Sequence, residues 1–198
     1  MSVLSLCLEP HPVLRSKARP VEAFTDDVRR LARDLIETMY ANDGIGLAAP
    51  QVGRDLQVFV ANPSQEHGKE LVVINPVLDA ADGRAAVIEG CLSLPSIWER
   101  VRRAAHVRLT GQDFSGRSIA LEAEGLLAIV LQHECDHLQG RLLIDRLSWI
   151  RRCWLRARPP SRRPVRTRPR GHDRRAGARP GHHEWGAGEA GYGPAACA

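Results

Sequence analysis

The 198-residue sequence has no run of eighteen apolar residues, and aromatic side chains make up only 5% of it. A membrane-spanning helix needs such a run, so the sequence argues against a membrane protein. The pattern of a cleavable secretion signal is also missing, because Glu9, Pro10 and His11 interrupt the first apolar stretch. The five cysteines are odd in number and lack the spacing of a disulfide framework, which favours a reducing compartment. We therefore expect a cytoplasmic protein.

Lysine is absent after Lys69, and the net charge of +5 is unevenly distributed. Residues 149–198 contain twelve arginines and three acidic residues, a net charge of +9, whereas residues 1–148 carry −4. The basic segment is also rich in proline and glycine, which oppose long helices and a buried core. We expect a folded domain over residues 1–152 and a disordered Arg/Pro/Gly-rich tail over residues 153–198. Two interpretations of the tail stay open, a genuine RNA-contacting segment and an off-frame or unselected extension.

The spacing of apolar residues predicts helices and strands in separate parts of the chain. Residues 26–42 have helical spacing, with Thr25 as the N-cap. A second helix is predicted over residues 125–139, ended by Gly140. Between them lie β-forming runs at residues 56–61, 71–74 (before Asn75-Pro76), 85–88, 105–109 and 119–123. The last two runs flank a turn and are typical of an antiparallel hairpin. This order favours an α+β domain.

The strongest local signal is the sequence H-E-C-D-H at residues 133–137, on the second predicted helix. Residues four apart lie one turn above each other, so both imidazoles can bind one metal ion. Glu134, about 100° around the helix, can reach a water molecule at the same site. Because the pattern is short, the alternative to a metal site is that the two histidines occur together by chance.

A site of this kind needs a third protein ligand and a position for water. Two zinc-protease patterns do not supply it, because position 143 is Leu143 and the only downstream glutamates lie in the glycine-rich tail. Upstream, the sequence E-G-C-L-S at residues 89–93 ends a β-like run. Its cysteine, Cys91, is the best candidate for the third ligand.

The stretch G-I-G-L-A-A-P-Q at residues 44–51 has little side-chain bulk, so its backbone is open to close approach. Gln51 adds an amide that can donate a hydrogen bond. On its own, this stretch is more simply a tight turn after the first helix.

Together these three segments resemble the peptide deformylase family, whose motifs have the forms G-x-G-x-A-A-x-Q, E-G-C-x-S and Q-H-E-x-D-H. The motifs are complete and in order, and the likeness covers roughly residues 3–152. Enzymes of this family remove the N-formyl group from the formylmethionine of new polypeptides and release formate. The resemblance implies an α+β fold, with antiparallel strands around a central metal-binding helix and the first helix outside.

The resemblance also implies a role for each matching residue. The metal ligands would be Cys91, His133 and His137. Glu134 would be the general base and then the general acid, while the Gln51 amide and the Leu92 backbone N–H would hold the oxyanion. Strand-like backbone pairing with the peptide would involve Ile45, Gly46 and Gly90.

The pocket for the methionine side chain follows partly from spacing. Leu126, Ile129 and Val130 precede His133 by seven, four and three residues, so they share its helix face. Plain core packing is the alternative for these three. Glu89 and Arg103 are interpreted as a supporting ion pair. Trp98 stands near where relatives often carry a basic residue, which bears on peptide affinity.

The resemblance implies one divalent metal ion, Fe²⁺ in the first place, with Zn²⁺, Ni²⁺ or Co²⁺ able to replace it. The expected partners are N-formylmethionyl nascent peptides and, through the basic C-terminal segment, the ribosome near the polypeptide exit. We expect a monomer without membrane or DNA partners. Three other functions stay open: a zinc endopeptidase, a catalytically silent homologue, and an RNA- or ribosome-binding protein that acts through its basic tail.

Overall fold

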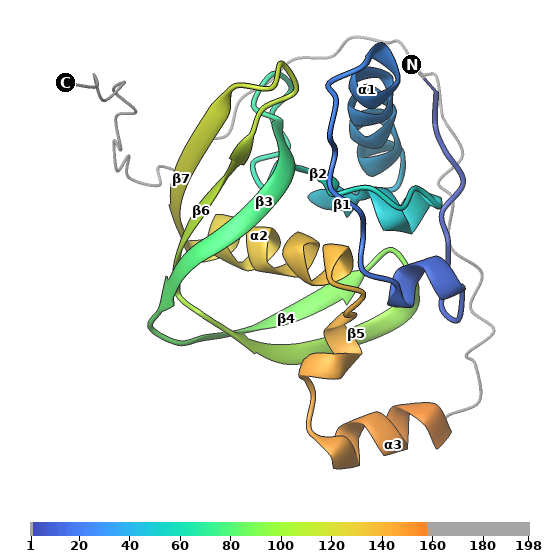
Figure 1. Cartoon of the computed structure of the whole chain (residues 1–198). Coiled ribbons are helices and arrows are strands. Elements are labelled where there is room, and N and C mark those ends of the chain that lie inside the picture. The colour runs from blue at the N-terminus through green and yellow to red at the C-terminus, as the bar shows by residue number, and fades with distance from the viewer. Residues whose placement is uncertain (1, 158–198) are drawn as a thin grey trace, which may run out of the picture. The chain divides into compact units, whose positions relative to one another are not determined.

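A five-stranded antiparallel sheet lies between two helices in the computed structural model, which describes residues 2–157 (Figure 1). Its strands, in spatial order, are β1 (Gly46–Ala48), β2 (Val58–Ala61), β3 (Leu71–Asp82), β6 (His106–Gln112) and β7 (Ser118–Glu124). A separate hairpin consists of β4 (Ala85–Cys91) and β5 (Leu94–Arg103). Every pairing between these strands is antiparallel, and the β6–β7 hairpin lies where the alternation predicts it. The α+β fold is confirmed.

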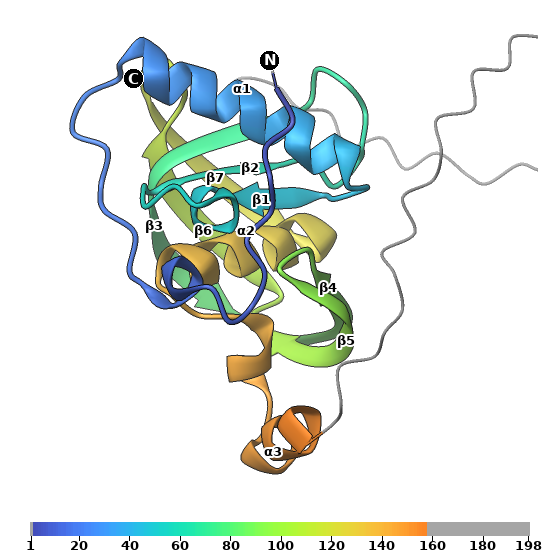
Figure 2. The ribbon, with the colours of Figure 1, turned by 90° about the vertical axis from the view of Figure 1, so that its right-hand side faces the viewer.

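The two helices are α1 (Asp26–Ala41) and α2 (Gly125–Leu138), and they pack against opposite faces of the sheet (Figure 2). Strand β2 is covered on both faces by these helices, and all four of its residues are buried. Phe59 and Ala61 pack in one core cluster with residues of α2, whereas Val58 and Val60 pack in another with residues of α1. Successive strand residues point to opposite faces, so one strand supplies both cores.

Both helices begin and end close to the predicted residues. The Thr25 hydroxyl accepts a hydrogen bond from the Val28 backbone N–H at 3.4 Å, which confirms the N-cap of α1. Helix α2 ends at Leu138, and Gly140 follows with a φ of 69°, the left-handed conformation that glycine adopts readily. The predicted bounds of both helices are therefore confirmed to within one residue.

Strand β3 runs beyond the point where the sequence suggested an end. The Asn75-Pro76 pair was expected to follow the strand, but the strand continues to Asp82. The register shifts between Ile74 and Val77, and Asn75 has a φ of 51°. A bulge is a position where a strand tolerates proline, which has no N–H to donate. The Asn75 side chain holds the bulge in place, because it forms hydrogen bonds with the Val21 backbone N–H and carbonyl and with the Gln112 side chain.

The apolar periodicity missed two strands, β1 and β5. Strand β1 has only three residues, too few to show a pattern. Strand β5 contains Pro95 and turns Glu99 and Arg103 toward the interior, so it does not alternate between apolar and polar residues. A reading based on hydrophobicity cannot recognise a strand whose buried face carries charges.

Within residues 2–157 the remaining elements are three 3-10 helices and one short helix. They are η1 (Pro12–Arg15), η2 (Ala49–Val52), η3 (Leu143–Arg146) and α3 (Trp149–Ala157). Helix α3 extends across the boundary expected at residue 152, and the rest of the expected disordered tail lies outside the described residues. None of the helices within residues 2–157 combines the length and apolar character that crossing a membrane requires.

Candidate metal centre

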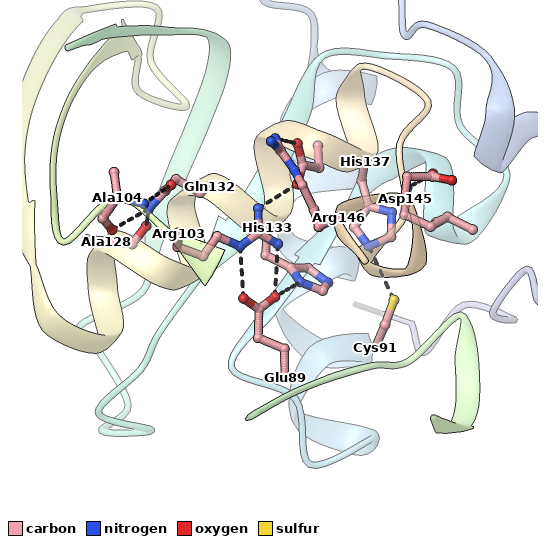
Figure 3. Close-up of polar contacts among 12 residues, drawn as sticks. Glu89, Cys91, Arg103, Ala104, Ala128, Gln132, His133, His137, Asp145 and Arg146 are labelled. Atoms are coloured by element: carbon pink, nitrogen blue, oxygen red, sulfur yellow. Dashed lines mark hydrogen bonds and ion pairs between the residues drawn. The ribbon is translucent and has the colours of Figure 1, made fainter. Parts of the chain in front are cut away.

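Three side chains from two distant segments converge at the end of β4. One donor atom each from Cys91, His133 and His137 lies within 4.8 Å of the others (Figure 3). The Cys91 Sγ atom is 3.3 Å from the His137 Nε2 atom. These are the three residues that the sequence predicts as ligands. A thiolate and two imidazoles at this spacing can bind a borderline divalent ion such as zinc or iron.

Glu89 orients the first of the two histidines. Its Oε2 atom lies 2.9 Å from His133 Nδ1, and the Arg103 guanidinium donates two further hydrogen bonds to the carboxylate, at 2.8 and 2.9 Å. Burial disfavours the charged carboxylate, but the bonds from Arg103 and His133 outweigh it and lower the pKa of Glu89 to about 2. The ionised Glu89 carboxylate accepts a hydrogen bond from the Nδ1–H group of His133, so the Nε2 atom is the nitrogen that is available to a metal ion.

Arg103 is in turn held by a second carboxylate. Its Nη1 atom donates to Asp136 Oδ2 at 2.5 Å, and Arg146 donates to both oxygens of the same carboxylate. The Arg103 side chain is almost completely buried, so its charge needs both partners. The expected Glu89–Arg103 ion pair is therefore present, and it connects β4, β5 and α2 in one network (Figure 3).

The two histidines have opposite proton affinities. Burial lowers the pKa of His133, but hydrogen bonds with Cys91 and Glu89 outweigh this and raise it to about 10, so a metal ion would displace the proton from its Nε2 atom. Burial, together with the nearby His133 charge, holds the pKa of His137 well below its usual value. The His137 Nδ1 atom is buried and has no hydrogen-bond partner within residues 2–157. His137 is thus a neutral imidazole whose Nε2 atom faces the cysteine, as a metal ligand requires.

Glu134 is a buried carboxyl of α2 that lacks a full set of partners among the described residues. Its side chain is only 3% exposed, and its Oε2 atom has no hydrogen-bond partner among the described residues. Burial raises its pKa to about 7, so the carboxyl can both accept and release a proton near neutrality. Strand β1 packs directly on it, since a Cβ atom at Gly46 would overlap Glu134 Oε1 and lie 2.9 Å from Val130 Cγ1. Glycine at 46 is therefore required for this close approach.

Gln51 points its amide nitrogen at the same centre. Its Oε1 atom accepts a hydrogen bond from the Ala48 backbone N–H at 2.9 Å, which fixes the orientation of the amide. Its Nε2 atom donates to Ser93 Oγ at 3.2 Å and lies 3.7 Å from Cys91 Sγ. The side chain is completely buried, so this donor is held in place before any ligand arrives.

Two strand edges are open beside the cluster. Strand β1 is at the edge of the large sheet, and β4 pairs only with β5 among the described strands. The Ile45 carbonyl accepts from the Asn62 N–H at 2.8 Å, so the backbone groups of the next residue, Gly46, point to the open edge. Gly90 lies at the other edge, one residue before Cys91.

The three residues expected in the methionine pocket differ in burial. Leu126 is 52% exposed, whereas Ile129 and Val130 are buried. Val130 packs in the core cluster with Ala48 and Phe59, so core packing accounts for part of its environment.

The sequence reasoning missed two contributors to this centre. Ser93 is fully buried and accepts the Gln51 hydrogen bond, although it belongs to the E-G-C-x-S motif and could have been singled out there. Arg146 is the second arginine on Asp136, and nothing in its local sequence signals that contact. Cys135, the residue between Glu134 and Asp136, is a free thiol half-buried against the core, and burial raises its pKa to about 12.

Comparison with known proteins gives a consistent result. A family model described as polypeptide deformylase matches residues 3–152. The peptide deformylase of Alkalilimnicola ehrlichii is 46% identical over 153 residues, which are 77% of this chain and 86% of the relative. The crystal structure of peptide deformylase from Thermus thermophilus is 46% identical with a TM-score of 0.73, covering 78% of this chain and 92% of the other. The Legionella pneumophila enzyme structure is 37% identical with a TM-score of 0.76, at the same coverages.

Proposed function

Because the chain belongs to the polypeptide deformylase family, we propose that it hydrolyses the N-formyl group of N-formylmethionyl polypeptides to formate and a free amine. The observation that supports this most directly is the position of Glu134, buried without a partner for one oxygen, next to three side chains with the spacing of a metal site. Such a carboxyl has no structural role that explains the cost of burying it.

We propose that Cys91, His133 and His137 hold one divalent ion, Fe²⁺ in the native enzyme, with Zn²⁺, Ni²⁺ or Co²⁺ as substitutes. A bound ion of this kind supplies Lewis-acid chemistry, polarising a carbonyl and lowering the pKa of water. The donor set fits it, because the Glu89–Arg103 pair orients His133 and burial keeps His137 neutral. The domain that performs the reaction is taken as residues 1–152.

The reacting groups of the chain then have distinct tasks. Glu134 takes a proton from the water that attacks the formyl carbon, so a C–O bond forms first; it then passes the proton to the amine nitrogen, and the C–N bond breaks as the formyl oxygen returns to a carbonyl. The Gln51 amide and the Leu92 backbone N–H donate hydrogen bonds to the formyl oxygen while it carries negative charge. The locked orientation of Gln51 means that little reorganisation is needed at that moment.

The substrate enters as a strand between the two open edges. Its backbone pairs with Gly46 and Gly90, whereas the expected pairing with Ile45 is not retained, because the Ile45 carbonyl already accepts from the Asn62 N–H. Its methionine side chain lies against Leu126, Ile129 and Val130 on the helix face of His133. We further propose that the enzyme acts in the cytoplasm as a monomer, on nascent chains, with the basic C-terminal segment contacting the ribosome.

The decisive experiment measures formate release from a formyl-Met-Ala-Ser peptide by protein purified without oxygen, together with its metal content. An acetyl-Met peptide and an unformylated peptide serve as substrate controls. His133→Ala should lose both metal and formate release. His106→Ala is the matched control, because this exposed histidine pairs with Asp82 and Glu124 away from the centre and should leave both unchanged.

The alternative functions give different results in the same assay. A metal-loaded wild-type protein that releases no formate would be a silent homologue. Cleavage of internal peptide bonds in an unformylated peptide would indicate an endopeptidase.

A further inference from the structure

The β4–β5 hairpin has one buried and one exposed face. Glu89 and Glu99 are paired across the two strands and both are buried, on the side where Glu89 contacts α2. Strand residues two apart share a face, so Ile88 and Gly90 lie on the opposite side, across from Arg100 and Trp98. That opposite face carries two large apolar side chains in water, Ile88 at 72% exposure and Trp98 at 69%.

Trp98 lies directly on the backbone next to the metal centre. A Cβ atom at Gly90 would be only 2.9 Å from the Cη2 and Cζ3 atoms of the Trp98 indole, so the ring rests against Gly90 itself. Gly90 immediately precedes Cys91, one of the three clustered donors. The indole is therefore held within one residue of the reaction centre, with most of its surface free to meet a ligand.

The alternation of side chains decides which part of a peptide would meet this surface. A peptide strand along the open edge of β4 points successive side chains to opposite faces of the hairpin. If its first side chain, methionine, points toward α2, its second points to the face of Trp98 and Ile88. Its third points back toward α2.

We propose that Trp98, supported by Ile88, is a specificity-determining residue that selects large apolar or aromatic side chains at the second position of the formylated peptide. This inference rests on the proposed deformylation. An aromatic side chain at the second position covers apolar surface of the indole, and such ring contacts are favourable. Ile88 extends the same surface two cross-strand pairs further from the metal centre, at the next pair on this face of the hairpin.

The test compares kcat/KM for three peptides, formyl-Met-Phe-Ala, formyl-Met-Ala-Phe and formyl-Met-Ala-Ala. Phenylalanine at the second position should raise kcat/KM roughly two- to tenfold over alanine in the wild type. Phenylalanine at the third position should change it by less than about twofold, because its side chain points away from Trp98. Trp98→Ala should remove most of the second-position advantage, and Trp98→Phe should retain it.

Two further variants keep the test independent of folding defects. Trp98→Arg should replace the preference for phenylalanine with a preference for aspartate at the second position, a gain that a damaged protein cannot show. Trp149→Ala, which removes a similarly exposed tryptophan on α3, should leave the ratios of kcat/KM between the three peptides unchanged.

Two results would overturn the proposal in different ways. A phenylalanine advantage that is equal in wild type and Trp98→Ala, or that occurs only at the third position, contradicts the role of Trp98 and leaves deformylation intact. Absence of formate from all three peptides with metal-loaded wild type would contradict the deformylase function and this inference with it.

Discussion

Helices α1 and α2 cover opposite faces of one sheet, yet α1 buries only one of its charged side chains, Asp34, whereas α2 buries the titratable groups around the candidate metal centre. Helix α1 buries an apolar stripe that includes Leu35 and keeps its ion pairs, such as Arg30 with Asp27, in water. Helix α2 turns Glu134, Asp136 and His137 inward. A buried charge must be compensated, so most of the polar groups of α2 have partners in the β4–β5 hairpin.

The exceptions in α2 are informative. Glu134 Oε2 and His137 Nδ1 are buried without a hydrogen-bond partner in residues 2–157, and both belong to the residues proposed to act in the reaction. This comparison suggests that α1 contributes mainly to stability and α2 mainly to activity. Substitutions in the two regions should therefore affect different measurements.

The largest effect is expected for Glu134→Ala. Loss of the proposed general base should lower kcat roughly 10²- to 10⁴-fold, while the metal content stays unchanged because the three ligands remain. Formate release and metal analysis of the same preparation test this. Asp27→Ala, which removes an exposed carboxylate of α1, is the control and should retain full activity. Normal turnover in a metal-loaded Glu134→Ala protein would exclude Glu134 as the base.

Gln51→Ala should have the next largest effect. Loss of one oxyanion donor should lower kcat on the order of 10²- to 10³-fold. Steady-state kinetics with a formyl-Met peptide separate kcat from KM, and Gln139→Ala, at an exposed position just after α2, is the control. A change in KM alone would make Gln51 a substrate-binding residue instead of an oxyanion donor.

Leu35→Ala tests the other side of the comparison. This leucine of α1 is fully buried, and its truncation should lower the free energy of unfolding by about 2–5 kcal/mol. Denaturant unfolding measures that loss. The kcat of the folded protein should stay within about twofold of the wild-type value, since the residue packs with α1, β1 and β2 on the face away from α2. A large fall in kcat without a loss of stability would contradict the division between the helices.

Acid should reveal the contribution of Glu89. Its pKa is lowered in the folded state to about 2, so the unfolded chain binds its proton first and the stabilisation is present above about pH 4.5. This contribution, on the order of 3 kcal/mol, should be lost as the pH falls through the folded-state pKa near 2. The free energies of unfolding of the metal-free wild type and of Glu89→Gln, measured at several pH values, should therefore become equal at low pH. Glu122→Gln, an exposed substitution on β7, is the control, and a difference that persists at pH 2 would refute the assignment.

The smallest effect is expected for Arg30→Ala in α1. Its ion pair with Asp27 is 3.8 Å long and both side chains are mostly exposed, so the free energy of unfolding should change by less than about 0.5 kcal/mol. Denaturant unfolding in low and high salt tests this. A loss of more than about 1 kcal/mol in the free energy of unfolding would show that ion pairs stabilise α1 as strongly as they stabilise α2.

Much of the fold could be predicted because it depends on local rules. The 3.6-residue period and the Thr25 cap identified α1, and the alternation around residues 113–116 identified the β6–β7 hairpin. Prediction failed where a strand does not follow its usual pattern. The bulge at Asn75 lets β3 pass through proline, and β5 buries Glu99 and Arg103 in place of apolar residues.

The sequence by itself determined the chemical types of the site and their local geometry. Helical spacing sets His133 and His137 one turn apart with Glu134 beside them, because successive residues of a helix have fixed angular positions. Only the tertiary structure decided that Asp136 holds Arg103 from α2, that Arg146 joins the same carboxylate, and that Trp98 lies on Gly90. Those contacts join segments that are far apart in the chain or across a hairpin, and pairing of this kind depends on the packing of the whole sheet and on the compensation of buried charge.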